Sequence, residues 1–129
     1  MEARYRFVVT FRVAPTVEEV SISPVEFETT LYYRAVRPGE DGWRFFRDNL
    51  WRGEVNDHAD FRDRTADALD VTVTRVEFRG LETDAEYLEA LRKAIADSLV
   101  EFKADSVDEV VTKYLGSKVQ VCKGEPTEC

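Results

Sequence analysis

The 129-residue chain is 43% hydrophobic, and its 26 acidic and 18 basic residues give a formal net charge of −8. This length and composition predict one folded domain, exclude a wholly disordered chain, and disfavour a nonspecific grip on nucleic acid or anionic lipid. The sequence has no apolar run long enough to cross a membrane and no secretion signal in its first residues, so we expect a cytoplasmic protein without a membrane partner.

Two segments near the start of the chain alternate apolar and polar residues, which is the pattern of half-buried strands. In residues 4–13, RYRFVVTFRV, the side chains at odd positions are apolar. The second predicted strand is FETTLYYRAV, residues 27–36, and Pro38-Gly39 ends it. Residues 14–24 contain two prolines and read as a loop, in which residues 23–26, SPVE, form a capping box that could open one helical turn.

Two helices are predicted after these strands. Asp41 is the candidate N-cap of a helix over residues 42–52, and Gly53 is the residue expected to end it. Asp57 is the candidate N-cap of a second, short helix in HADFRDRTADAL, residues 58–69.

The second half of the chain predicts a strand followed by two more helices. VTVTRVEFR, residues 71–79, is rich in valine and threonine and is the third predicted strand. Thr83 and Glu86 form a capping box before a strongly amphipathic helix. The apolar stripe of this helix consists of Leu88, Leu91, Ile95, Leu99 and Phe102. Ser106 and Glu109 repeat the capping box before a last helix.

Because strands and helices do not alternate as in a parallel α/β fold, the predicted fold class is α+β. We expect one domain over residues 1–122, with an antiparallel or mixed sheet of about three to four strands and about four helices mainly on one face. SKVQVCK, residues 117–123, is the candidate for a short fourth strand, and residues 123–129 form a polar tail. Cys122 and Cys129, with one distant histidine, are a poor metal set, so we expect an incidental pair of thiols.

The stretch WRFFRDNLWRGEVND, residues 43–57, concentrates aromatic and arginine side chains. The apolar residues that would share one face of a helix here are Trp43, Phe46 and Leu50. Packing of these three side chains in the core would therefore account for much of the stretch, and no functional site is needed to explain it. It does not explain why Trp51 and Arg52 stand together at the end of the predicted helix.

Tryptophan and arginine are the residues most enriched in binding hot spots. Arg47 lies four positions before Trp51, so on a helix its guanidinium would lie over the indole. A helix C-terminus disfavours anions, so Arg52 suits a carboxylate-bearing partner or an internal ion pair better than phosphate. The candidate binding residues are Arg47, Trp51, Arg52, Glu54, Asp57 and His58, with no catalytic residue, metal ligand or cofactor assigned.

Three functions are compatible with these residues. The leading hypothesis is a non-enzymatic protein-interaction module, whose partner is a second copy of the chain or another protein. The second is a small-ligand or nucleotide-binding regulator, in which strand arginines and Trp51 surround a pocket and bind a phosphate or carboxylate. The alternative role of these arginines is to form ion pairs with glutamates on neighbouring strands. These arginines are Arg4, Arg6, Arg12, Arg34 and Arg75. The third is a metal-dependent hydrolase, whose residues would be Glu54, Asp57, His58 and Asp60, although their spacing matches no established motif.

The five lysines all lie from Lys93 onward, whereas twelve of the thirteen arginines lie at or before Arg79. Few lysines and many acidic side chains favour a protein of a very salty cytoplasm, because molar salt shortens the Debye length to about 3 Å and screens self-repulsion. An ordinary acidic bacterial protein is the alternative interpretation of this composition.

The block FFRDNLWRGEVND, with FETT before it, VEFR after the second helix and KYLGS near the end, resembles the LWR-salt family of halophilic archaea. The resemblance covers nearly the whole chain. It implies a salty cytoplasm and reduced cysteines, and it supplies no catalytic residues.

Overall fold

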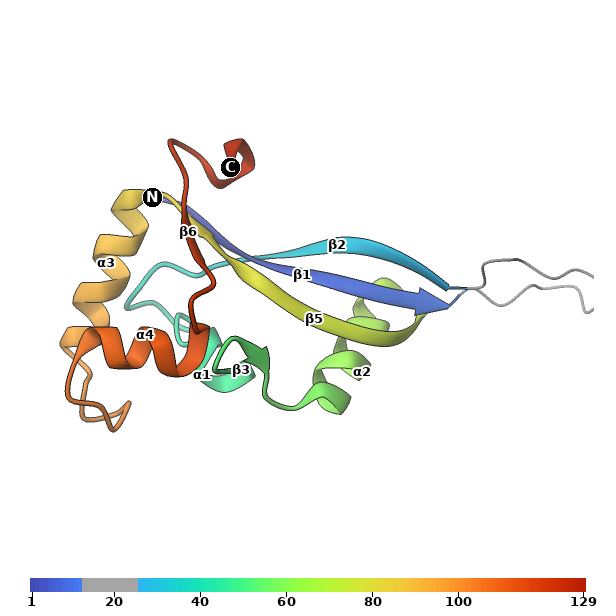
Figure 1. Ribbon diagram of the computed structural model, residues 1–129, viewed down its shortest axis with the longest axis horizontal. Coiled ribbons are helices and arrows are strands. Elements are labelled where there is room, and N and C mark those ends of the chain that lie inside the picture. Colours follow the sequence, from blue (N-terminus) through green and yellow to red (C-terminus); the bar gives the residue numbers. More distant parts are fainter. Residues whose placement is uncertain (13–25) are drawn as a thin grey trace, which may run out of the picture.

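A mixed four-stranded sheet, in the order β2-β1-β5-β6, organises the computed structural model, which describes residues 1–12 and 26–129 (Figure 1). Its strands are β1 (Ala3–Arg12), β2 (Glu26–Arg34), β5 (Thr72–Thr83) and β6 (Val119–Val121). β1 pairs antiparallel with β2 and β5, whereas β6 pairs parallel with β5. The other elements are the hairpin strands β3 (Leu50–Trp51) and β4 (Glu54–Val55), the helices α1 (Phe45–Asn49), α2 (His58–Leu69), α3 (Ala85–Ala96) and α4 (Val107–Leu115), and a short 3-10 helix, Pro126–Glu128.

The helices and the hairpin lie mainly on one face of the sheet, below it in Figure 1, and this arrangement confirms the predicted α+β fold. Alternation in β1 explains the two faces, because Tyr5, Phe7 and Val9 are buried while Arg4 and Arg6 remain partly exposed on the other side. No helix within the described residues is long and apolar enough to cross a membrane.

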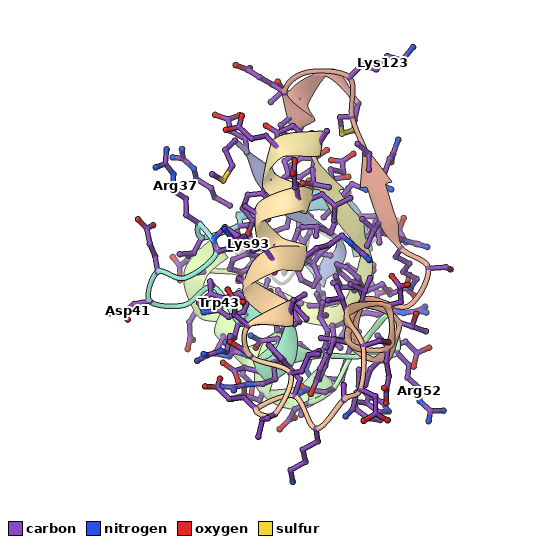
Figure 2. All side chains as sticks on the ribbon, turned by 90° about the vertical axis from the view of Figure 1, so that its left-hand side faces the viewer. Arg37, Asp41, Trp43, Arg52, Lys93 and Lys123 are labelled. Carbon is purple, nitrogen blue, oxygen red and sulfur yellow. A yellow bond between two sulfur atoms is a disulfide. The ribbon has the colours of Figure 1, made fainter. Side chains whose placement is uncertain are left out.

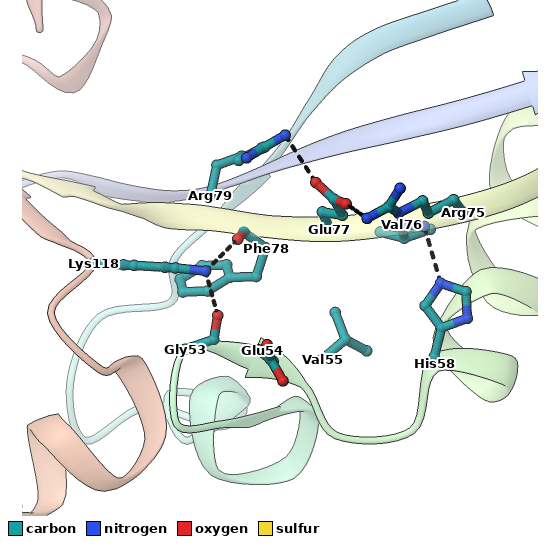
Figure 3. A pocket seen from close by; sticks show the side chains of 10 residues that line it. All are labelled: Gly53, Glu54, Val55, His58, Arg75, Val76, Glu77, Phe78, Arg79 and Lys118. Atoms are coloured by element: carbon teal, nitrogen blue, oxygen red, sulfur yellow. Dashed lines mark hydrogen bonds and ion pairs between the residues drawn. The ribbon is translucent and has the colours of Figure 1, made fainter.

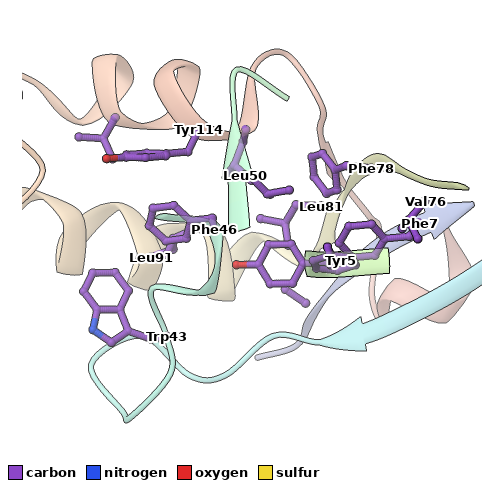
Figure 4. Packing of buried hydrophobic residues seen from close by; sticks show 14 of the residues in the cluster. Tyr5, Phe7, Trp43, Phe46, Leu50, Val76, Phe78, Leu81, Leu91 and Tyr114 are labelled. Carbon is purple, nitrogen blue, oxygen red and sulfur yellow. The ribbon is translucent and has the colours of Figure 1, made fainter. Parts of the chain in front are cut away.

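The core between sheet and helices is built largely from aromatic rings (Figure 4). The ring of Phe7 on β1 lies 4.9 Å from that of Phe61 on α2 and 5.5 Å from that of Phe78 on β5, measured between centroids. The predicted burial of the anchors in the tryptophan-rich stretch is confirmed for Trp43, Phe46 and Leu50. Aromatic contacts therefore tie the first strand to elements far along the chain.

The helix predicted over residues 42–52 is wrong in its extent. Only Phe45–Asn49 is α-helical, and the chain then forms a tight hairpin in which Trp51 pairs with Glu54. The two residues of its turn, Arg52 and Gly53, have positive φ angles of 50° and 81°. Positive φ at both turn positions is the geometry of a type I′ hairpin, which fits the twist of the flanking strands and ends the helix early.

Two of the four predicted helix starts agree with the structure. The expected N-caps Asp57 and Ser106 are confirmed, since their side chains accept hydrogen bonds from the backbone N–H groups three residues later. Asp41 caps nothing, because α1 begins after Arg44. The third helix is capped by Asp84 rather than Thr83.

Two other predicted boundaries differ from the structure for tertiary reasons. The predicted third strand ended at residue 79, but β5 continues to Thr83 because it pairs with β1 on one side and β6 on the other. The third helix ends at Ala96, and Phe102, predicted on its stripe, is instead buried from the turns that follow. The fourth strand is confirmed over Val119–Val121. The loop expected over residues 14–24 lies wholly outside the described residues, as do residues 23–25 of the capping box.

The C-terminal tail folds back on the sheet instead of remaining frayed. Cys122 and Cys129 form a disulfide, so the expectation of an incidental, reduced thiol pair is wrong for this structure. The Cys122 N–H donates to the Thr83 carbonyl at 2.7 Å, and a guanidinium nitrogen of Arg4 donates to the Pro126 carbonyl at 3.2 Å. These contacts place the tail at the end of the sheet where the chain begins (Figure 1).

Asp84 gives the fold a measurable pH dependence. Burial disfavours its charge, but hydrogen bonds from the backbone N–H groups of Tyr87 and Glu2 outweigh burial and lower the pKa of Asp84 below 3.8. We expect Asp84→Ala to lower the free energy of unfolding at neutral pH by about 1 kcal/mol, the usual effect of losing a helix cap.

Because the folded-state pKa is depressed, this contribution is present above the ordinary aspartate pKa of about 3.9 and is lost as the pH falls through the folded value. Urea unfolding of wild type and variant should therefore converge at low pH. Asp41→Ala, which removes an aspartate that caps no helix, is the matched control. A deficit of Asp84→Ala that stayed constant down to pH 2.5 would contradict this role.

Candidate functional site

The tip of the β3–β4 hairpin caps the C-terminal end of α4. The Arg52 N–H donates to the Lys113 carbonyl at 2.7 Å, and the Gly53 N–H donates to the Tyr114 carbonyl at 2.9 Å. Carbonyls in the last turn of a helix have no partner within the helix. The motif residues at 52 and 53 therefore satisfy, through their backbone, groups that α4 leaves open.

Lys118 extends this contact to the sheet. Its ammonium donates to the Gly53 carbonyl at 2.7 Å and to the Phe78 carbonyl on β5 at 3.1 Å. A Cβ at Gly53 would lie 3.3 Å from the Leu115 carbonyl oxygen, so the glycine permits the close approach. We call the group formed by Arg52, Gly53, Lys113, Tyr114 and Lys118 the hairpin clamp.

The side chain of Trp51 projects from the clamp without taking part in its hydrogen bonds. The indole is 43% exposed, whereas its neighbour Leu50 is completely buried. Its ring lies edge-on to Tyr114, with centroids 5.9 Å apart. The Arg52 guanidinium carbon and the Lys113 ammonium nitrogen lie 5.5 and 6.0 Å from the indole centroid, so two cations flank one exposed aromatic ring.

A shallow groove of about 800 Å³ runs beside this ring, along α4. We call it the Trp51 surface, and it is lined by Trp51, Arg52, Asp108, Glu109, Thr112, Lys113 and Gly116. Figure 2 shows the Arg52 side chain pointing outward from the body of the protein. The groove thus combines an exposed aromatic ring with charges of both signs.

The other predicted site residues are dispersed. Arg47 pairs with Asp48 at 3.2 Å and does not cover Trp51, because the helix that would have set their spacing ends at residue 49. Glu54 lies opposite Trp51 in the hairpin, and Asp57 caps α2. The structure therefore brings together Trp51, Arg52 and Glu54, and it adds Lys113 and Tyr114, which the sequence reasoning missed.

His58 closes one end of a pocket along β5 (Figure 3). The pocket, about 460 Å³, lies between the hairpin and the β5 edge that β6 leaves unpaired before Leu81. Nε2 of His58 accepts the Val76 N–H at 3.2 Å, and Lys118 binds the Phe78 carbonyl further along the same edge. Both side chains form hydrogen bonds with backbone groups of β5 that, on an exposed strand edge, could otherwise pair with another chain.

The residues of the hydrolase hypothesis have separate partners. Asp57 accepts the Asp60 N–H, the Asp60 carboxylate pairs with Arg64 at 3.0 Å, and His58 accepts the Val76 N–H. Within residues 1–12 and 26–129, no three His, Cys, Asp or Glu side chains are grouped so that they could hold a metal ion.

None of the strand arginines lies over the Trp51 ring. By strand register, Arg4, Arg6, Arg12 and Arg34 lie on the open face of the sheet, whereas Arg75 on β5 lines the pocket that the hairpin borders (Figure 3). Arg4 pairs with Glu82 at 3.0 Å, and Arg12 pairs with Glu26 at 3.1 Å, so cross-strand pairing accounts for part of the set. Arg75 pairs with Glu77 on its own strand.

Sequence comparison adds a family to this geometry. The family model described as LWR-salt protein matches residues 1–125. No curated protein and no solved structure shows a significant match to the chain. The family description names no activity, so the function must be argued from the structure itself.

The clamp predicts a specific cost for a side chain at position 53. Gly53→Ala should destabilise the protein by about 1 kcal/mol for the positive φ alone, with a further cost for the contact at the Leu115 carbonyl. Gly39→Ala is the matched control, because Gly39 has a φ of 92° and no atom within 4 Å of its Cβ position. Equal destabilisation of the two variants in urea unfolding would show that the hairpin tip does not pack tightly on α4.

Proposed function

The chain belongs to the LWR-salt protein family, and we propose that it is a non-enzymatic protein-interaction module of a very salty cytoplasm. The observation that carries the proposal is the position of Trp51, which is 43% exposed on a hairpin whose backbone is fixed by the clamp. Leu50 supplies the hairpin's buried contact, and the backbone of Arg52 and Gly53 supplies its hydrogen bonds. Much of the indole surface therefore makes no contact within the fold.

A rigidly held aromatic ring is well suited to binding. Tryptophan buries a large area when a partner covers it, and little conformational freedom is lost because the hairpin is already ordered. Such rings, together with arginine, dominate the energetics of many interfaces. The combination of Trp51 with Arg52 on one fixed turn supports a contact surface at this point.

The chemistry of the surface indicates what the partner offers. Arg52 and Lys113 flank the indole, so an apolar side chain next to a carboxylate would complement it. In molar salt only charges in direct contact interact strongly, since the Debye length is about 3 Å. Burial of the Trp51 ring would therefore supply most of the affinity, and the two cations would orient an acidic segment.

The acidic total charge supports the salty setting. A net charge of −8 on 129 residues repels itself in dilute buffer, and molar salt screens this repulsion. The same screening would permit two copies of the chain, or this chain and another acidic protein, to come together. A second copy is one partner that the Trp51 surface could accept, because the groove carries charges of both signs.

The test is capture of partners from a halophile lysate in molar KCl, together with sedimentation of the purified protein at the same salt. We expect Trp51→Ala to retain at least tenfold less of the captured protein, or of the dimer, while its far-UV circular dichroism stays native. Its free energy of unfolding should fall by only about 1 kcal/mol, because the indole is half exposed.

Leu69→Ala is the control, since Leu69 is 36% exposed on α2, away from the hairpin. It should bind as wild type does. A Trp51→Ala variant that unfolds would show that the indole is part of the fold. A folded variant that retains the same species in the same amount as wild type would show that the indole is not part of a contact surface. Either result would contradict the proposal.

A further inference from the structure

The outer edge of β2 offers a row of backbone hydrogen-bonding groups. Within the described residues, β2 pairs with β1 on one side and with no strand on the other (Figure 1). The Ala35 N–H donates to the Ala3 carbonyl at 2.9 Å, so by alternation the odd-numbered residues of β2 bond to β1. The even-numbered residues of β2 therefore direct their N–H and C=O groups toward the free edge.

β2 lacks features that commonly protect a strand edge from another chain, such as lysine, proline, a bulge or a covering group. Its segment EFETTLYYR contains neither lysine nor proline, and its register with β1 has no bulge, unlike the register between β1 and β5. His58 and Lys118 bind backbone groups of β5, but no side chain in the described part of the protein binds the backbone of residues 26–34. Within that part, the edge of β2 is open along its whole length.

The charges on β2 are arranged so that the strand complements itself. Glu26 and Glu28 lie at its start, and Arg34 lies at its end. A two-fold axis at Thr30, the middle residue, would place Glu26 of each copy opposite Arg34 of the other copy. Opposite charges facing each other across a strand pair are stabilising. Glu26 already accepts a hydrogen bond from Arg12 at 3.1 Å, but a carboxylate can accept from two guanidinium groups.

The same axis matches apolar side chains on the other face of β2. Phe27 is 38% exposed, and Leu31 and Tyr33 are partly exposed, although all three lie on the core-facing side of the strand by register. The axis would place Phe27 opposite Tyr33, and Thr29 opposite Leu31, of the second copy. Aromatic pairs across strands stabilise a sheet, so binding of a second copy would cover side chains that one copy leaves exposed.

Thr30 is the centre that uses the whole strand. Centres at Thr29 or Leu31 would leave two residues of each strand beyond the end of the other. A centre midway between two residues would set the outward-facing groups of one strand against groups that already bond to β1.

We propose that two copies of the chain pair antiparallel through their β2 strands, about a two-fold axis at Thr30, and form one continuous sheet. Each copy carries a net charge of −8, but molar salt screens the long-range repulsion between the copies. Charges in direct contact, such as Glu26 and Arg34 across the interface, still attract each other at this salt concentration.

This interface is separate from the Trp51 surface. The hairpin lies on the helix-covered side of the sheet, whereas β2 forms its edge (Figure 1). A second copy bound at β2 leaves the Trp51 surface to a different protein. The captured protein is then the readout for Trp51, and the dimer is the readout for β2. Trp51→Ala should keep this dimer, so failure of one proposal leaves the other standing.

Sedimentation equilibrium of the purified protein in molar KCl tests the proposal, and we expect wild type to be a dimer. Arg34→Glu should weaken the dimer at least about tenfold, because it sets like charges opposite Glu26 twice in each dimer. The fold should tolerate this change, since Arg34 lies opposite Arg4 within one copy and a like-charge pair becomes an opposite-charge pair. Lys123→Glu is the matched control, because it makes the same charge change on an exposed residue after β6, at the other edge of the sheet.

Cysteine cross-linking tests the register. The Cα atoms of a hydrogen-bonded antiparallel pair lie about 5.5 Å apart, within the range of a disulfide, so oxidised Thr30→Cys should form a covalent dimer. In Tyr32→Cys the two new thiols would be four residues out of register, roughly 14 Å apart, and should not join. Cys122 and Cys129 are bonded to each other, so the introduced thiol is the free one. A monomeric wild type, an Arg34→Glu variant that dimerises as wild type does, or cross-linking of Tyr32→Cys as readily as Thr30→Cys would each overturn the proposal.

Discussion

Two hydrogen bonds join the tip of the β3–β4 hairpin to the last turn of α4, and the arrangement of the helical layer depends on them. They satisfy carbonyls that α4 cannot satisfy itself, and they hold Arg52 in a backbone conformation that non-glycine residues seldom adopt. Lys118 continues the connection to β5 through the Gly53 and Phe78 carbonyls. These hydrogen bonds hold the hairpin, α4 and β5 together next to the buried side chain of Leu50 (Figure 4).

Neighbouring residues of the hairpin have different roles in this arrangement. The backbone at positions 52 and 53 and the side chain of Leu50 build the fold, whereas the Trp51 side chain remains half exposed. His58 has a structural task as well, because it occupies the free edge of β5. The sequence blocks LWRGEVND, VEFR and KYLGS meet at this one place, so their residues are explained first by packing and capping and only then by binding.

Alternation and local capping made much of the fold predictable, because strand faces and the caps at Asp57 and Ser106 depend on nearby residues. The hairpin was not predictable in this way, since NLWRGEV has helical spacing and its turn lacks the usual Asn-Gly or Asp-Gly signal. Its geometry is imposed by carbonyls of Lys113 and Tyr114, about sixty positions away. The site followed the same rule: Trp51 and Arg52 stood out in the sequence, but their cationic and aromatic neighbours on α4 did not.

Amide hydrogen exchange at the hairpin tip tests the clamp most directly. Exposed turns normally exchange fast, whereas amides in cooperative structure exchange only when that structure opens. We expect the Arg52 and Gly53 amides to exchange as slowly as the amide of Leu81 on β5, which donates to the Lys118 carbonyl just before β6. Exchange of both amides as fast as that of Gly39, in an exposed turn, would contradict the clamp and the division of roles built on it.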